Sequence, residues 1–333
     1  MFAADYLKNQ SLENGSSYKV NSVKNREELK AYIYNRYGPP EVLNQVNIEK
    51  PFPNSDEVLI KVKAVSVSSG DVRLRSSNFP RLYWLLARLI FGLLRPKRKI
   101  LGHEFSGVVQ KVGEKVYEFK EGDEVFGTTT MLKAGAYAQY VCIPQTWKYG
   151  VMAIKPSNLG HDESAALPIG AMTALFLLEK ANISSAQRIL IYGASGSVGT
   201  YAVQLSSHYN VEVTAVCSSA NLQMVRELGA NKLIDYLLDD FKKVADRFDI
   251  VFDAVGKINK SSAQKILKPK GSFVSVKMMT KETRNHLLKI KELSEKKEIK
   301  PVLDKVYQFN ELVEAHKYVD QGHKKGNVVV LVD

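Results

Sequence analysis

The spacing of hydrophobic positions along this chain has two different patterns, and the pattern changes near residue 155. Residues 57–67 alternate apolar and polar side chains, which predicts a strand with one buried face. Further short strands are predicted at 107–112, 124–126 and 136–143, with the tight turn Glu121-Gly122-Asp123 between the first two. Many short strands joined by glycine turns indicate a small β-barrel in this part of the chain.

Beyond residue 155 the apolar spacing becomes helical and alternates with short, fully apolar runs. The runs predict buried parallel strands at 189–192, 211–216, 250–252 and 271–276. Helices are predicted around them at 164–167, 171–180, 198–208, 221–228 and 284–298. This alternation indicates an α/β domain with a doubly wound parallel sheet. Residues 327–332 predict a strand that returns to the first domain.

The turn after the strand at 189–192 carries glycines at 193, 196 and 199, and a helix follows it at once. A strand, a glycine-rich turn, a helix and a second strand form the context in which a dinucleotide binds. Gly196 lets the backbone approach a pyrophosphate, and Gly199 lets the helix pack closely on the strand. Ala194 stands where the usual pattern has its first glycine. The helix N-terminus offers its N–H groups to the phosphates, so the stretch predicts dinucleotide binding.

The residues after the second strand of this unit favour one coenzyme. Cys217 lies where an NAD enzyme places an acidic residue on the ribose 2′-OH, and Ser218, Ser219 and Asn221 follow it without a carboxylate. Small hydroxyl and amide donors suit a 2′-phosphate, so NADPH is favoured over NADH. The same residues would also cap the next helix, and the two roles are compatible.

Composition is that of a globular protein. The 333 residues leave room for two domains, and the hydrophobic content of 45% supplies a full core. Two cysteines, Cys142 and Cys217, exclude a disulfide framework and a four-cysteine zinc site. Residues 1–29 are polar and predict a disordered extension. The N-terminus lacks the basic start and apolar core of a secretory signal, so a cytoplasmic location is expected.

The net charge of +12 would suit nucleic acid, an anionic membrane or phosphate-bearing ligands. The lysines are spread along the chain, and no basic motif with interleaved aromatic residues of the RNA-binding kind is present. A solvated basic surface is therefore favoured.

Residues 82–94 form a strongly apolar segment that Arg88 interrupts. The segment is too short to span a bilayer. The basic run RPKRK after it is compatible with a helix lying on a membrane surface. A helix that covers the mouth of an active site or packs on the core is the favoured interpretation.

Nine stretches together resemble one superfamily, and they run in its order from about residue 30 to the end: YGPPEVL, GHEFSGVV, FKEGDEVFG, GAYAQYV, ALPIGAMTAL, YGASGSVG, LGANKLIDY, FDAVG and AHKYVDQGHKKGNVVV. The chain resembles the zinc-free members of the medium-chain dehydrogenase/reductase superfamily, close to the NADPH:quinone oxidoreductases. The resemblance implies a GroES-like barrel domain at 30–155 and 300–333, and a Rossmann domain at 156–299. A cleft between them would hold the nicotinamide and the substrate.

The resemblance also implies where the coenzyme lies. The pyrophosphate would lie against the glycine-rich turn and the 2′-phosphate at the end of the next strand. Two residues would flank the coenzyme, one would face the nicotinamide, and one tail lysine is a further phosphate candidate. The residues implied for the pyrophosphate are Ser195, Gly196, Ser197 and Val198, and those for the 2′-phosphate are Ser218, Asn221 and Tyr236. Val255 and Gly256 would flank the coenzyme, Thr173 would face the nicotinamide, and Lys324 is the tail lysine.

Zinc members of the superfamily use two cysteines and a His-Glu pair at the catalytic metal. Here Ser68 replaces the first cysteine, the pair survives as His103-Glu104, and Pro168-Ile169-Gly170 replaces the region of the second. A catalytic zinc needs three good protein ligands, so no metal is expected. Residues 127–136 also lack the cysteines of a structural zinc lobe.

Ser68, Asp71 and Tyr137 are the candidates to line the substrate site or assist protonation. Each has a structural alternative, since Asp71 would cap a helix and Tyr137 would fill the core. Hydride transfer to an electron-poor acceptor needs mainly positioning and hydrogen bonds. The predicted function is therefore an NADPH-dependent reductase of quinones or α,β-unsaturated carbonyl compounds.

Two other functions stay open: an NAD(P)-dependent alcohol dehydrogenase, and an NADPH-loaded protein that binds RNA or a partner without turnover. The superfamily's sixth Rossmann strand, which often pairs two subunits, is shortened or missing after Val276. The expected homodimer is therefore in doubt.

Overall fold

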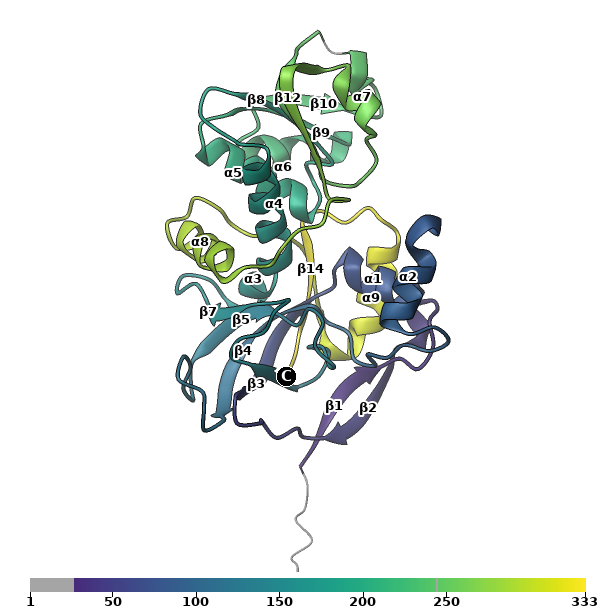
Figure 1. Cartoon of the computed structure of the whole chain (residues 1–333), viewed down its shortest axis with the longest axis vertical. Helices are drawn as coiled ribbons and strands as arrows, with labels where there is room; N and C mark the ends of the chain where they lie inside the picture. Colours follow the sequence, from purple (N-terminus) through teal and green to yellow (C-terminus); the bar gives the residue numbers. More distant parts are fainter. Residues whose placement is uncertain (1–26, 244) are drawn as a thin grey trace, which may run out of the picture.

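Two sheets form the two lobes of the chain in the computed structural model, which describes residues 27–243 and 245–333 (Figure 1). One lobe is built on a sheet of seven strands in the order β13-β14-β3-β4-β5-β7, with β6 paired to β3. The other is built on a sheet of five strands in the order β10-β9-β8-β11-β12. The fold is therefore a GroES-like barrel domain joined to a Rossmann domain, as predicted.

The strands of the barrel lobe are short except for β3. They are β3 (Glu57–Ser66), β4 (Glu104–Val112), β5 (Glu124–Thr128), β6 (Tyr140–Pro144), β7 (Met152–Ile154), β13 (Leu303–Gln308) and β14 (Asn327–Leu331). A separate antiparallel pair is formed by β1 (Glu28–Ile33) and β2 (Asn44–Glu49). The helices of this lobe are α1 (Ser69–Ser76), α2 (Arg81–Phe91), α3 (His161–Ala165) and α9 (Leu312–Asp320).

The expectation of one buried face is wrong for β3. Val58, Leu59 and Ile60 are consecutive and all buried, so both faces of the strand are covered. The reason is its central place, because β3 pairs with β4, β6 and β14. The pairing with β14 is antiparallel and confirms that the C-terminal strand returns to the barrel.

All strand pairs of the Rossmann lobe are parallel. Its strands are β8 (Arg188–Tyr192), β9 (Glu212–Cys217), β10 (Lys232–Asp235), β11 (Phe248–Asp253) and β12 (Leu267–Ser275). Its helices are α4 (Pro168–Lys180), α5 (Ser197–His208), α6 (Leu222–Glu227), α7 (Lys260–Gln264) and α8 (Arg284–Glu295). Residues 276–283 contain no strand, which agrees with the expected loss of the sixth strand and leaves β12 at the edge.

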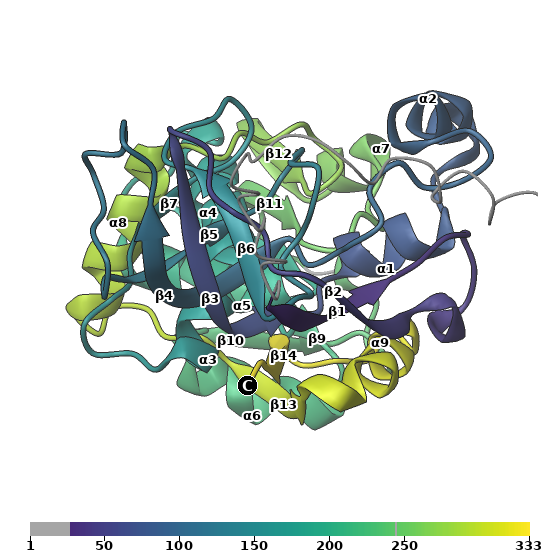
Figure 2. The same ribbon diagram turned by 90° about the horizontal axis from the view of Figure 1, so that it is seen from below.

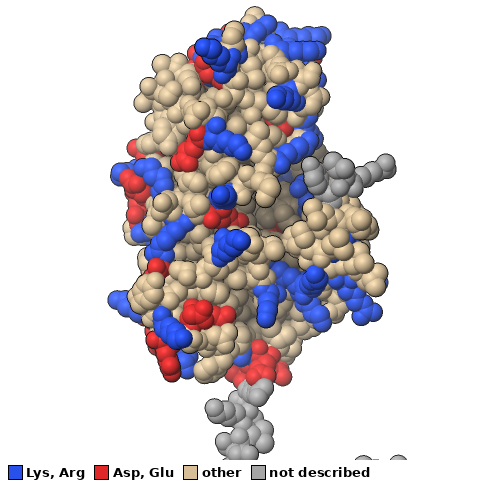
Figure 3. Space-filling view, viewed as in Figure 1, with Lys and Arg blue, Asp and Glu red and all other residues tan. Residues whose placement is uncertain are grey.

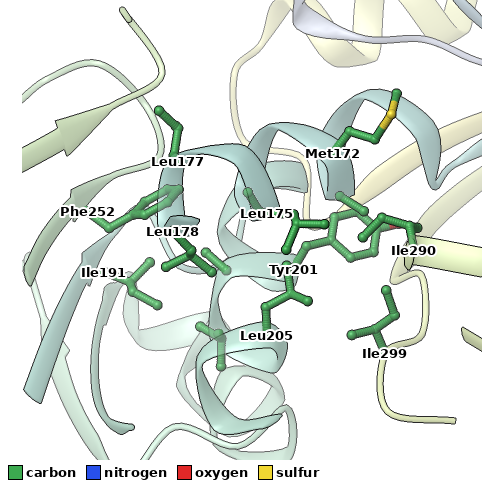
Figure 4. Close-up of a cluster of buried hydrophobic side chains, with 14 of the residues drawn as sticks. Met172, Leu175, Leu177, Leu178, Ile191, Tyr201, Leu205, Phe252, Ile290 and Ile299 are labelled. Atoms are coloured by element: carbon green, nitrogen blue, oxygen red, sulfur yellow. The ribbon is translucent and has the colours of Figure 1, made fainter. Parts of the chain in front are cut away.

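The core of the Rossmann lobe explains why these sequences form these elements. Leu178 of α4 lies near Ile191 of β8 and Phe252 of β11, and Leu175 of α4 and Leu205 of α5 lie beside Tyr201 (Figure 4). All of them are buried, and such apolar burial is the main favourable contribution to folding.

The expectations for residues 1–29 and for residues 82–94 need correction. The polar extension predicted for 1–29 ends earlier, because β1 begins at Glu28 and Leu29 is buried; residues 1–26 lie outside the described part. Most of the apolar segment at 82–94 lies in α2, but Leu85, Leu86 and Leu89 do not pack on the core. The helix lies at the periphery of the barrel lobe (Figures 1 and 2), and Leu85, Leu86 and Leu89 are exposed. Among the described residues, no helix is both long and apolar enough to cross a bilayer.

Candidate active site

The glycine-rich turn after β8 has the geometry that a pyrophosphate needs. Gly193 has a positive φ of 79°, which favours glycine. A Cβ atom at Gly199 would lie 2.1 Å from the carbonyl oxygen of Gly193, so only glycine fits there. Gly196 is the N-cap of α5, and no side chain caps the helix. The N–H groups of the first turn are therefore available to an anion, and the residues present fit a dinucleotide.

The C-terminal tail closes over this turn. The N–H of Gly326 donates to the carbonyl oxygen of Ser195 at 2.8 Å, and the hydroxyl of Ser197 donates to Oδ1 of Asn327 at 2.6 Å. Lys324 donates to the carbonyl oxygen of Gly326. Burial lowers the pKa of Lys324 to about 8, although the nearby carboxylate of Glu104 opposes the shift. The tail thus brings a cation between the turn and the barrel.

The amide of Asn221 joins the turn to the end of β9. Its Nδ2 donates to the hydroxyl oxygens of Ser195 at 3.3 Å and Ser218 at 3.1 Å. Its Oδ1 is buried without a hydrogen-bond partner. Three of the predicted coenzyme residues therefore form one cluster, with an acceptor left for a ligand. Tyr236 lies nearby on the exposed side, its ring centroid 6.5 Å from that of Tyr192.

A carboxylate that sequence reasoning missed lies beside this cluster. Asp235 ends β10, the strand next to β9, and it accepts a hydrogen bond from the hydroxyl of Ser219. That bond and the N–H of Leu237 hold the pKa of Asp235 below its ordinary value, so the group is charged at neutral pH. Asp235 is far from Ser219 in sequence, and only the strand order brings them together.

The loop after β11 is held by one buried carboxylate. Oδ1 of Asp253 accepts from the N–H groups of Val255, Gly256 and Lys257, and Oδ2 accepts from Ile258. A Cβ atom at Gly193 would lie 2.6 Å from the Val255 side chain, so this loop touches the glycine-rich turn. Val255 therefore lies against the turn, and the expectation that Val255 and Gly256 flank the coenzyme stays a prediction.

On the barrel side of the cleft, Asp71 is the centre of a hydrogen-bonded cluster. Its Oδ2 accepts from the hydroxyl of Ser68 at 2.6 Å. A capping box on α1 is formed because Oδ2 also accepts from the N–H of Ser68 at 3.1 Å while the Ser68 hydroxyl oxygen accepts from the N–H of Asp71. Its Oδ1 lies 2.6 Å from Nδ1 of His103 and 3.0 Å from the N–H of Gly102. Burial alone would raise the pKa of Asp71, but His103 and Ser68 hold it well below its ordinary value.

Sequence reasoning assigned His103 only to a structural pair with Glu104. The structure gives the two residues separate partners. Glu104 is buried, accepts from the hydroxyl of Ser66 at 2.6 Å and accepts from the N–H of Ile169 at 2.8 Å. Burial raises the pKa of Glu104 to about 7, although both hydrogen bonds oppose the rise. Ile169 lies in the first turn of α4, and Thr173, half-buried, follows it by one turn.

These contacts test whether the site suits a zinc ion. Both carboxylate oxygens of Glu104 accept hydrogen bonds, and Ser68 is a poor ligand where zinc members have a cysteine, so Nε2 of His103 is the one good donor left of that set. Within the described part of the chain, no group of three or more His, Cys, Asp or Glu residues is arranged to hold a metal ion. The donor set therefore does not fit the catalytic zinc of the superfamily.

Tyr137 differs from Ser68 and Asp71 because its ring belongs to the apolar core of the barrel. Its hydroxyl donates to the carbonyl oxygen of Ser66 at 3.3 Å, and its ring packs edge-on against His316. Nδ1 of His316 lies 3.2 Å from Arg75, which has no acceptor, so Nδ1 carries the lone pair. These contacts support the structural role considered for Tyr137.

Glu282 connects the segment after β12 to the barrel. Its carboxylate accepts from the hydroxyls of Thr128 at 2.5 Å and Thr130 at 2.8 Å. Burial raises the pKa of Glu282, while the two threonines and nearby His103 oppose the rise. Residues that elsewhere in the superfamily form a sixth strand here cross to the other lobe. Figure 3 shows the surface hollowed between the two lobes.

Comparison with known proteins agrees with this geometry. Residues 54–156 match the alcohol dehydrogenase GroES-like domain, and residues 197–317 match the zinc-binding dehydrogenase family. The chain is 32% identical to 2-methylene-furan-3-one reductase of Solanum lycopersicum, over 91% of this chain and 79% of that protein. It is 31% identical to the chloroplastic NADPH-dependent alkenal/one oxidoreductase of Arabidopsis thaliana, over 91% and 80%.

A solved structure of the quinone oxidoreductase from Coxiella burnetii superposes with a TM-score of 0.81 at 27% identity, covering 92% of this chain and 100% of that one. The two sequence relatives each match 91% of this chain. The chain therefore belongs to the medium-chain dehydrogenase/reductase superfamily and is an oxidoreductase.

Proposed function

We propose that this protein is an NADPH-dependent reductase that transfers hydride to quinones or α,β-unsaturated carbonyl compounds without a metal ion. The observation that carries the proposal is the donor set around His103: Ser68 stands in place of a metal-binding cysteine and bonds to Asp71 at 2.6 Å, and both oxygens of Glu104 accept hydrogen bonds. The names of the tomato and Arabidopsis relatives support an enone or alkenal acceptor.

The coenzyme lies between the glycine-rich turn and the barrel. Bound NADPH supplies the hydride. Ser195, Gly196, Ser197 and Val198 bind the pyrophosphate, with Lys324 as a nearby cation. Ser218, Asn221 and Tyr236 hold the adenosine end, and the unpartnered Oδ1 of Asn221 supports that assignment. Val255 and Gly256 flank the coenzyme, and Thr173 faces the nicotinamide.

His103 supplies the proton. Because Nδ1 is bonded to Asp71, Nε2 is the nitrogen left to face an acceptor. The side chain is 12% exposed, so it exchanges protons with solvent. The acceptor takes one hydride from NADPH and one proton from His103, and NADP⁺ and the reduced acceptor result. Asp71 orients His103, and Ser68 orients Asp71, so both are positioning residues.

The test is oxidation of NADPH and NADH against a panel of quinones and enones, before and after treatment with a chelator. Turnover with NADPH that survives chelation is the expected result. Gly196→Ala serves as the control, because its Cβ atom would intrude on the pyrophosphate but contact only the carbonyl oxygen of Gly193, at 3.6 Å. Activity that chelation abolishes and zinc restores would identify an alcohol dehydrogenase instead. Tight RNA binding without NADPH oxidation would favour the binding protein.

The small-molecule acceptor is the only partner that this proposal requires. A cytoplasmic location remains a prediction from the N-terminal sequence. The homodimer also remains a prediction, and the free edge of β12 is the surface on which it depends.

A further inference from the structure

Helix α2 has the reverse of the usual arrangement of a surface helix. Arg88, in its last turn, faces the protein: the guanidinium lies 4.0 Å from the ring centroid of Tyr37 and donates to the hydroxyl of Ser77 at 3.2 Å. The hydroxyl of Tyr37 donates to the carbonyl oxygens of Phe91 and Gly92. The polar face of the helix is thus fixed against the barrel.

The apolar face points outward. Leu85, Leu86 and Leu89 are 58%, 57% and 54% exposed, and Leu94 in the following turn is 84% exposed. Trp84 lies on the same helix and is also exposed. A continuous exposed patch of large apolar side chains marks an interaction surface, because leaving it in water is costly.

The charges around the patch indicate what covers it. From Val72 to His103 the chain has six arginines and two lysines and no acidic residue. Arg95, Lys97 and Lys99, directly after the helix, are exposed. Figure 3 shows blue side chains gathered beside the uncharged surface on the side where α2 lies. Apolar side chains with a tryptophan and a basic border suit the interface of an anionic lipid bilayer.

We infer that α2 and the basic turn after it, residues 84–99, bind the surface of an anionic membrane. The leucines enter the boundary of headgroups and acyl chains, and Arg95, Lys97 and Lys99 contact lipid phosphates. This attachment lies on the surface of the membrane, in keeping with the eleven-residue length of α2. It goes beyond the proposed reductase activity and does not depend on it.

Sedimentation with vesicles tests the inference on the full chain. Phosphatidylcholine vesicles with phosphatidylglycerol are expected to bind the protein at least about tenfold more tightly than phosphatidylcholine alone. Leu85→Glu/Leu89→Glu is expected to abolish binding, and Arg95→Glu/Lys99→Glu to abolish the preference for anionic lipid. The matched controls, Leu238→Glu and Lys265→Glu/Lys297→Glu, change exposed residues elsewhere and keep wild-type binding. An unchanged melting temperature and NADPH affinity show that each variant is folded.

Tryptophan fluorescence reports directly whether α2 enters the lipid interface. The chain has two tryptophans, and Trp147 donates its indole N–H to the carbonyl oxygen of Thr130. In Trp147→Phe the remaining signal comes from Trp84, which is expected to shift to the blue on anionic vesicles. Equal binding to neutral and anionic vesicles, or an unchanged Leu85→Glu/Leu89→Glu variant, would overturn the inference. So would an α2-dependent oligomer that binds no vesicles, because the patch would then be a protein interface.

Discussion

Asp71 and His103 are joined by a 2.6 Å hydrogen bond between Oδ1 and Nδ1, across the junction of α1 and β4. The same aspartate completes the capping box of α1 with Ser68. One buried carboxylate therefore serves both the fold and the site. The two roles can be separated by changing its partners one at a time.

Asp71→Asn is expected to lower kcat/KM for an enone by about 10²-fold, because the amide does not fix the orientation and tautomer of His103 as the carboxylate does. Ser68→Ala removes the cap but leaves the bond to His103. It is expected to cost about 1 kcal/mol in unfolding free energy and to change kcat only a few-fold. Steady-state kinetics across pH, with denaturant unfolding of both variants, gives the comparison. Equal losses of kcat in the two variants would show that Ser68 acts on the substrate itself.

Substitutions of Gly196 and Gly199 by alanine are expected to have different effects, the first on coenzyme binding and the second on stability. A Cβ atom at Gly196 would lie 3.6 Å from the nearest atom, whereas one at Gly199 would lie 2.1 Å from a backbone oxygen. Gly196→Ala is expected to fold with a loss within about 1 kcal/mol and to weaken NADPH binding at least about tenfold. Gly199→Ala is expected to lose about 1–3 kcal/mol of stability through overpacking. Calorimetric titration with NADPH and thermal unfolding separate the two outcomes. An unaltered NADPH affinity in Gly196→Ala would place the coenzyme elsewhere.

Asp235 makes coenzyme choice testable. Its carboxylate holds Ser219 at the end of β9, where a 2′-phosphate would be repelled. Asp235→Asn removes that charge, so the ratio of kcat/KM for NADPH over NADH is expected to rise by about tenfold, which corresponds to roughly 1.4 kcal/mol. Asp246→Asn is the control, because Asp246 pairs with Arg188 and Lys232 at the far end of the strands. A ratio that stays constant in Asp235→Asn would mean that the 2′-position lies away from this strand.

The sequence alone predicted the parallel strands β8, β9, β11 and β12, because buried strands are short, continuous apolar runs. It missed β13, Leu303–Gln308, which is an edge strand with a mixed polar pattern and little burial. The orientation of α2 was also missed. The sequence pattern predicts an apolar helix face but does not tell whether that face packs on the protein or points to solvent. Here Arg88 packs inward on Tyr37.

The sequence predicted only those parts of the candidate site whose residues are close together in the chain. The glycine-rich turn is one contiguous motif, so its residues could be named in advance. Asp71 and His103 are separated by 32 positions, and Glu282 and Thr128 by 154, so their contacts depend on the completed fold. Asp235 illustrates the same limit, since the search for a carboxylate followed β9 and the group lies on the neighbouring strand.

The raised pKa of Glu104 predicts the direction in which the stability of the protein changes with pH. Its pKa is raised by burial from an ordinary value of 4.5 to about 7, so between these values the folded protein binds more protons than the unfolded chain. The stability that Glu104 contributes is therefore complete below about pH 4.5 and is lost as the pH rises through about 7. Glu104 and Lys324 influence each other, but the pKa of Lys324 is lowered only to about 8, so most of its own effect on stability falls above this window.

Glu104→Gln isolates the effect. The amide oxygen accepts from the N–H of Ile169 and the amide nitrogen donates to the hydroxyl of Ser66, so both hydrogen bonds survive while the titrating group is gone. Urea unfolding between pH 5 and pH 8 is expected to show the wild type losing stability relative to Glu104→Gln as the pH rises. A constant difference across that range would mean that Glu104 keeps one protonation state throughout, and that its contact with α4 is set by hydrogen bonding alone.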